Sequence, residues 1–276
     1  MIDEEAKSKE RRRELAYRYD LFIAPDWCER FDTIVAAHVK MPKKGRLLEI
    51  NCGTGAHAIA LAATLAEGDV VGTDESSERV AIARAKAAAT DAERCMFVEA
   101  DPEDLGFETD SFDGVVLDAS IVGPERLAAI AAEAVRVAKH DAPVAVKILL
   151  RGSFDEYFSI YWEALHELGI ADEVWDRLEP LMTSHPTLAD AVEVVRGAGL
   201  RHVEPHRSRE EWRFESGAEF LESPLVTDLF LAEWLAIVPA DRLAEVRAAI
   251  GRIIDRESEG SYFDVSAKAV VVSGRK

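Results

Sequence analysis

The sequence predicts an α/β protein whose sheet is mostly parallel and covered by helices on both faces. Short, nearly continuous apolar runs typical of buried strands recur along residues 46–150, and alanine-rich, helix-forming segments separate them. The chain has 276 residues, of which 48% are hydrophobic and 31% charged. That composition is typical of a globular protein, and that length is enough for a large buried core.

Strands and helices alternate through the first half of the chain. We expect strands at 46–50, 69–73, 95–100, 112–117 and 143–150, and helices at 55–67, 76–90 and 124–139. Ser76 or Ser77 is available to cap the second of these helices, and Pro124 stands near the start of the third. The leading segment, 10–39, is expected to be helical apart from a break at Pro25.

The second half of the chain is mainly helical. Helices are expected at 154–169, 172–182, 187–197, 218–237 and 240–256, and strands at 200–205 and 265–273. No flexible linker interrupts this pattern, so a single domain over residues 1–276 is expected.

Net charge and cysteine usage exclude several classes of protein. The chain carries 33 Lys+Arg and 52 Asp+Glu, a formal net charge of −19, which disfavours nucleic acid and anionic membrane surfaces as partners. The three cysteines form no CxxC pair, which argues against a disulfide framework or a structural zinc site. With no secretory signal and no apolar run of about 20 residues, a cytoplasmic location is expected.

The most informative motif is LLEINCGTGAH, residues 47–57. An apolar strand ends in a glycine-rich turn that opens a helix, which places backbone N–H groups at the carboxyl end of a strand. Gly53 and Gly55 can adopt positive φ and leave room for a ligand. The spacing from Gly53 to Ala58 also fits a dinucleotide fingerprint, with Asp74 as the expected ribose acid.

Charge separates the two interpretations of this turn. Glu49 precedes it, and Asp74, Asp101 and Asp118 end the next three strands, so we expect four carboxylates around one crevice and no Lys or Arg in the turn. Such a ring repels a pyrophosphate but attracts S-adenosylmethionine (SAM), whose methionine end is net cationic. Unit charges about 4 Å apart interact by roughly 4 kcal/mol at an effective dielectric near 20, so the sign of the charge decides.

At this point the sequence resembles the class I SAM-dependent methyltransferases, in particular the small-molecule type related to quinone-biosynthesis methyltransferases. The resemblance rests on the ordered set LLEINCGTG, VVGTDES, FVEADPEDLGF and FDGVVLDAS, and it covers roughly residues 17–150 and the closing strand. It implies a Rossmann-like, mostly parallel seven-stranded sheet with an antiparallel C-terminal strand and helical lid insertions. On this basis we expect a helical cap at 1–42, a cofactor-binding core at 43–152, helical lid or acceptor segments at 153–198 and 212–258, and closing strands at 199–211 and 262–276.

The same resemblance implies a role for each residue of the motifs. Glu49 would approach the methionine ammonium, Asp74 would accept from both ribose hydroxyls, and Asp101 would accept from the adenine amino group. The full set of implied cofactor-binding residues is Tyr19, Glu49, Asn51, Gly53, Gly55, Asp74, Glu75, Asp101, Pro102 and Asp118.

Two positions depart from the family pattern. Asn51 stands where the family usually has the first glycine of the turn, and Asn tolerates left-handed backbone better than most residues. Residues 139–143 replace the usual Pro-Gly-Gly before the fifth strand, a change of turn remote from the chemistry.

The predicted function is methyl transfer from SAM to a small molecule. Aromatic residues in 154–182 and 212–234 favour an apolar or aromatic acceptor. No general base is identified: Cys52 and His57 are more typical of packing, and His166 and His185 become candidates only if the helical half lines the acceptor pocket. A non-catalytic SAM-binding protein and, less favoured, an NAD(P)-dependent oxidoreductase are the alternatives. No metal site is expected, and the oligomeric state is left open.

Overall fold

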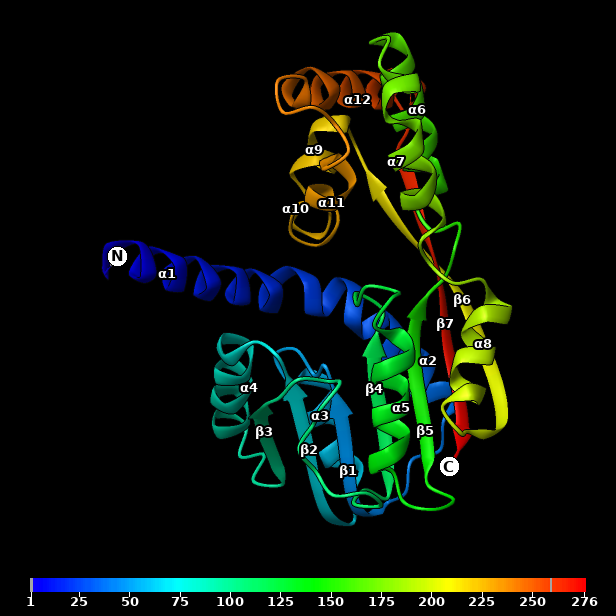
Figure 1. The fold of residues 1–276 in the computed structure, drawn as a ribbon. Helices are drawn as coiled ribbons and strands as arrows, with labels where there is room; N and C mark the ends of the chain where they lie inside the picture. The colour runs from blue at the N-terminus through cyan, green and yellow to red at the C-terminus, as the bar shows by residue number, and fades with distance from the viewer. Residues whose placement is uncertain (1, 259) are drawn as a thin grey trace. The chain divides into compact units, whose positions relative to one another are not determined.

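The computed structural model describes residues 2–258 and 260–276, and its elements alternate as the sequence predicts (Figure 1). The N-terminal part contains α1 (Ile2–Arg18), a π-helix η1 (Tyr19–Cys28) and α2 (Glu29–His38). The alternating part contains β1 (Lys44–Ile50), α3 (Ala56–Thr64), β2 (Glu67–Asp74), α4 (Ser77–Ala89), β3 (Cys95–Glu99), β4 (Gly114–Ala119), α5 (Leu127–Val137) and β5 (Pro143–Leu149). The remainder contains α6 (Asp155–Glu167), α7 (Ala171–Thr183), α8 (Leu188–Gly197), β6 (Arg201–Phe214), α9 (Gly217–Glu222), α10 (Pro224–Leu229), α11 (Leu231–Leu235), α12 (Leu243–Ser258) and β7 (Phe263–Arg275).

The sheet has seven strands in the order β3-β2-β1-β4-β5-β7-β6. The pairs β1–β2, β1–β4, β2–β3 and β4–β5 are parallel. Strand β7 runs the other way: Lys276 donates to the Ala142 carbonyl before β5, whereas Leu150, after β5, donates to the Lys268 carbonyl in the middle of β7. The predicted fold class, a mostly parallel seven-stranded sheet with an antiparallel C-terminal strand, is confirmed.

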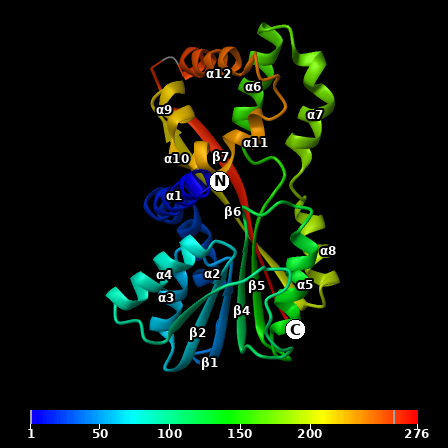
Figure 2. The same cartoon turned by 60° about the vertical axis from the view of Figure 1, so that its left-hand side comes forward.

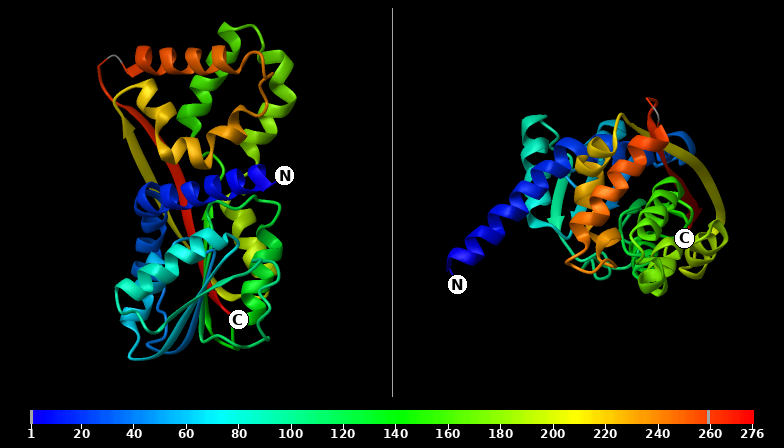
Figure 3. Two further views of the ribbon diagram at one scale, coloured as in Figure 1. Left: turned by 90° about the vertical axis from the view of Figure 1, so that its left-hand side faces the viewer. Right: turned by 90° about the horizontal axis from the view of Figure 1, so that it is seen from above.

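The helices cover both faces of the parallel strands. From β1 to β3 the chain moves along the sheet in one direction, through α3 and α4, and from β4 to β5 it moves in the other, through α5. Right-handed crossovers therefore place α3 and α4 on one face and α5 on the opposite face, as Figure 2 shows. Helix α8 packs beside α5, and α1 lies across α4 (Figure 3).

The chain divides into two compact units. The first comprises residues 1–148, 188–207 and 270–276, and the second comprises 149–187 and 208–269. The core of the second unit is aromatic: Tyr157 stacks on Trp234 with ring centroids 4.3 Å apart, and Phe154 and Phe220 complete the cluster. The expectation that the chain is one domain with the boundaries given above stays a prediction.

The N-terminal segment corrects one prediction. The expected helix break at Pro25 is absent, because residues 19–28 form a π-helix that includes this proline. The chain stays helical through Pro25, although this residue has no N–H to donate in either an α-helix or a π-helix. None of the helices within residues 2–258 and 260–276 combines the length and apolar character needed to cross a membrane.

Candidate active site

The glycine-rich turn adopts the left-handed backbone that its sequence requires. Asn51 has φ 58°, Gly53 φ 56° and Gly55 φ 81°, and Gly55 caps α3. A Cβ on Gly53 would lie 2.6 Å from the Tyr19 hydroxyl, and one on Gly55 would lie 2.7 Å from the ring of Phe97. The prediction of positive φ at these glycines is confirmed, but side chains of the chain itself occupy the space beside them.

The predicted carboxylates fall into three groups with separate partners. Glu49 and Asp118 belong to one buried cluster, Asp74 forms a second with an arginine, and Asp101 and Glu75 share a third, exposed arginine. They do not form a single uncompensated ring, because each group includes at least one cation. The turn itself carries no Lys or Arg, but other elements supply them.

The first group is centred on Lys147 of β5, whose side chain is 1% exposed. Its Nζ contacts Asp32 of α2, and lies 3.4 Å from Asp118 and 3.6 Å from Glu49. Burial alone lowers the pKa of Lys147, but the three carboxylates outweigh it and raise that pKa well above its usual value. Lys147 is therefore charged at neutral pH.

His57 belongs to the same cluster. Its Nδ1 lies 2.7 Å from Glu49 Oε1 and 3.6 Å from Asp32. Burial lowers the pKa of His57, yet the charge of Glu49 overcomes this effect, and the net shift is upward. His57 thus pairs with a predicted cofactor residue, a contact that the sequence did not indicate, and the expectation that it packs without a role in the site stays a prediction.

The second group joins the turn to the start of α4. Asp74 is 2% exposed and accepts hydrogen bonds from Gly53 N (2.9 Å), Ser76 N (2.9 Å) and Arg79 Nε (2.8 Å). The Arg79 guanidinium also lies over the Tyr19 ring, 5.0 Å from its centroid. Burial raises the pKa of Asp74, and the arginine and the backbone donors counter only part of that rise.

The third group surrounds Arg126, which precedes α5. It donates to Glu75 (3.0 Å), Asp101 (3.3 Å) and Glu103. Asp101 has 59% of its side chain exposed, and its neighbour Pro102 is buried. Surface ion pairs contribute little stability, so the carboxylates of this group can exchange partners at low cost.

A buried hydrogen-bond chain connects the N-terminal helices to Asp118. Trp27 Nε1 donates to Ser120 Oγ (2.9 Å), and Ser120 donates to Asp118 Oδ1 (2.6 Å). The Asn51 side chain donates to the Asp118 carbonyl (2.8 Å). Asn51 thus adopts the left-handed backbone conformation, and its side chain links the turn to β4.

Asp32, Arg79, Arg126 and Lys147 were not identified from the sequence. Lys147 could have been found, because it is the one charged residue in the apolar run PVAVKILL. Asp32, Glu49 and His57 also bring oxygen and nitrogen atoms within 4.8 Å of one another, a spacing that suits a metal ion. The Lys147 ammonium already contacts both of these carboxylates, so a cation of the chain itself balances the group.

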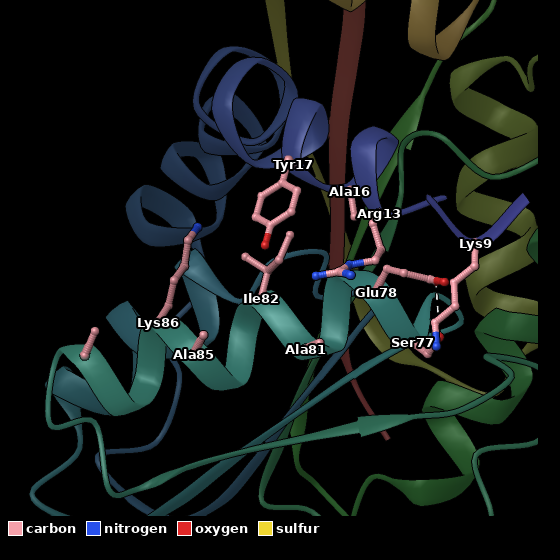
Figure 4. Close-up of a pocket in the computed structure, with 11 residues that line it drawn as sticks. Lys9, Arg13, Ala16, Tyr17, Ser77, Glu78, Ala81, Ile82, Ala85 and Lys86 are labelled. Atoms are coloured by element: carbon pink, nitrogen blue, oxygen red, sulfur yellow. Dashed lines mark hydrogen bonds between the residues drawn. The ribbon is translucent and has the colours of Figure 1, made fainter. Parts of the chain in front are cut away.

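Within the described part of the first unit, a small cavity lies at the turn and a larger groove lies away from it. The cavity lined by Glu49, Asn51, Asp118 and Lys147 has a volume of about 20 Å³, room for about one water molecule. A larger groove of about 640 Å³ lies between α1 and α4, where Arg13 and Tyr17 face Ala81 and Ile82 (Figure 4). None of the ten predicted cofactor residues is among the described residues that line this groove.

Comparison with known proteins identifies the class of domain. Residues 47–141 match the family model described as a methyltransferase domain. No curated protein sequence matches the chain. The residues matched span the glycine turn and include Asp74, Asp101 and Asp118.

Solved structures share the fold at low sequence identity. The YcgJ protein of Bacillus subtilis is 17% identical with a TM-score of 0.60, and the match covers 90% of this chain and 98% of that one. Phosphoethanolamine N-methyltransferase 2 of Haemonchus contortus, solved with S-adenosylhomocysteine (SAH), is 15% identical with a TM-score of 0.57, covering 95% of this chain and 57% of that one. The [4+2]-cyclase SpnF is 18% identical with a TM-score of 0.51, covering 90% and 80%.

Residues 47–141 therefore match a methyltransferase domain, and the chain shares its fold with the solved methyltransferase described above. The residues of the site suit SAM, the cofactor expected from the sequence: Glu49 Oε2 is buried and has no hydrogen-bond partner within the described part of the chain, so it is free to accept from a cation. The relation to quinone-biosynthesis methyltransferases stays a prediction.

Proposed function

We propose that the protein transfers a methyl group from SAM to a small-molecule acceptor, and that the turn after β1 holds the methionine end of the cofactor. The buried Glu49 carboxylate supports this most directly, because one of its oxygens has no partner among the described residues and it stands beside the turn. An unsatisfied buried carboxylate oxygen is costly, and a cationic ligand relieves that cost.

Asp74 is proposed to bind the ribose. It already accepts three hydrogen bonds within the chain, and a carboxylate has about four acceptor positions. One position therefore remains for a hydroxyl, and binding both hydroxyls requires the release of one internal bond. The side-chain bond from Arg79 is the one that can move, since the other two come from the backbone.

The other predicted residues are proposed to surround the adenine and the sulfur. We propose that Glu75, Asp101 and Pro102 face the adenine. In the structure Arg126 pairs with Glu75 and Asp101, and these exposed pairs would open for the carboxylates to bind the base. Tyr19 lies against Gly53 and is 8% exposed, which suits a side chain that covers the turn.

In the proposed mechanism the cofactor, when bound, supplies a methyl group on a cationic sulfur that an acceptor nucleophile attacks in line. The residues of this chain bind and orient it, and orientation alone lowers the barrier substantially. His57 is not assigned as a general base, because its pKa is raised and it is paired with Glu49.

An apolar or aromatic acceptor is proposed as well. Most aromatic residues that suggested it are buried in the core of the second unit and contact one another, so they do not line an acceptor site. Trp162 and Trp175 support the proposal, because Trp175 is 40% exposed and its ring centroid lies 5.0 Å from that of the half-buried Trp162. A cytoplasmic location and the absence of nucleic-acid and membrane partners also remain proposals.

The experiment that tests the proposed function has two parts. Calorimetric titration with SAH is expected to show binding that Asp74→Asn weakens by at least about tenfold, since one charge-assisted hydrogen bond contributes roughly 1.5–3 kcal/mol. Asp69→Asn is the matched control, because Asp69 lies on the same strand and pairs with Arg46 near the surface. Labelled SAM is then incubated with panels of phenols, carboxylates and amines, and a methylated product identifies the acceptor.

A SAM-binding protein without methyl transfer is the second candidate. The Asn51 side chain, which replaces a glycine hydrogen and donates to the Asp118 carbonyl, favours it, because this bond occupies an acceptor beside the turn. Tight SAH binding without any methylated product across the panels would support this candidate. NAD or NADP binding in place of SAH would instead support an oxidoreductase.

A further inference from the structure

We propose that Lys147 is the internal counter-cation of the cofactor site and determines how strongly the site prefers the positively charged donor over the neutral product. This inference rests on the proposed function and adds a residue that sets the charge of the site. Lys147 is a positioning residue in this scheme: it acts through the three carboxylates that surround it.

Lys147 lies at the centre of a buried cluster of charged side chains. The side chain leaves an otherwise apolar strand, is 1% exposed, and points its Nζ at Asp32, Glu49 and Asp118. A lysine that served only to hold α2 on the sheet would need Asp32 alone. Two of its three partners are instead residues that the methyltransferase motifs place beside the cofactor.

The cluster remains negative after this pairing. Three carboxylates face one lysine, which leaves −2, or −1 when His57 is protonated, and Glu49 Oε2 has no partner in the described residues. A buried negative charge attracts a further cation strongly, because low dielectric weakens screening. Lys147 reduces that attraction by one unit of charge, and Asp32 increases it by the same unit.

The two cofactor forms report this charge directly. SAM and SAH differ by one methyl group and one positive charge, so the ratio of their dissociation constants, Kd(SAH)/Kd(SAM), isolates the electrostatic preference of the site. A change in how α2 docks alters both constants together and leaves the ratio unchanged.

The experiment measures both constants by calorimetry at pH 8. Lys147→Met is expected to raise the ratio by roughly three- to tenfold, and Asp32→Asn to lower it by a similar factor. The double variant restores the charge count and is expected to return the ratio to that of the wild type. Asp32→Asn keeps the lysine paired with two carboxylates, so it tests the proposal even where Lys147→Met does not fold.

The control variants are Lys44→Met and Asp69→Asn, which make the same charge changes on exposed pairs near the opposite end of the strands. Neither is expected to shift the ratio. The proposal is overturned if the folded variants at positions 147 and 32 change both dissociation constants in parallel and leave their ratio unchanged. The Lys147–Asp32 pair would then have a structural role only. Failure of the wild type to bind either compound would instead refute the proposed function itself.

Discussion

Substitution of Gly55 by alanine tests the geometry of the glycine turn. Gly55 has φ 81°, where an L-residue is strained by roughly 1–2 kcal/mol. The added Cβ would also lie 2.7 Å from the Phe97 ring and 2.8 Å from the Ala83 Cβ, contacts that force neighbours apart at a cost of roughly 1–3 kcal/mol. Gly55→Ala is therefore expected to destabilise the chain by about 2–5 kcal/mol.

Gly106→Ala is the matched control, because Gly106 has φ 69° and no heavy atom within 4 Å of the added Cβ. It carries the backbone strain without the contact and is expected to cost only about 1–2 kcal/mol. Urea unfolding followed by circular dichroism measures both free energies. Equal losses for the two variants would refute the reasoning, since they would mean that Phe97 and Ala83 do not fill the space beside the turn.

One buried pair and two hydrogen bonds give three further predictions. The His57–Glu49 pair raises the folded-state pKa of His57, so its stabilisation is complete below the unfolded pKa of about 6.5 and is lost as pH rises through the folded value. Thermal stability of the wild type is therefore expected to fall more above pH 6.5 than that of His57→Gln, and parallel melting curves across pH would contradict this. Trp27→Phe removes the bond to Ser120 and is expected to cost about 1–3 kcal/mol by urea unfolding, and a neutral result would show that this bond is not made. Ser76→Ala removes the side-chain cap of α4 and is expected to cost about 1 kcal/mol in the same assay, a loss that Ser77→Ala should not reproduce.

Local patterns predicted the fold well because each strand can be recognised from a few consecutive residues. The strands predicted at 46–50, 69–73 and 112–117 correspond to β1, β2 and β4, and the crossover rule then placed the helices on both faces. Pro25 was misleading because a proline signal is local, whereas the helical conformation of residues 19–28 depends on how the buried residues Tyr19, Ile23 and Trp27 pack.

The candidate site was only partly predictable. The acids were found because they end strands, and the ends of parallel strands meet. Their partners Arg79, Arg126 and Asp32 were missed because nothing in the sequence near each acid indicates which distant cation approaches it. The acids at the strand ends are therefore compensated by cations that the folded chain brings in from other elements.

The order of strands has a consequence for synthesis on the ribosome. Strand β6 joins the sheet only through β7, which lies between it and β5. While the chain emerges, residues 201–214 therefore have no neighbour in the sheet until 263–275 have been translated. A nascent chain stalled before that point leaves one edge of β5 and both edges of residues 201–214 unpaired, and unpaired strand edges favour aggregation.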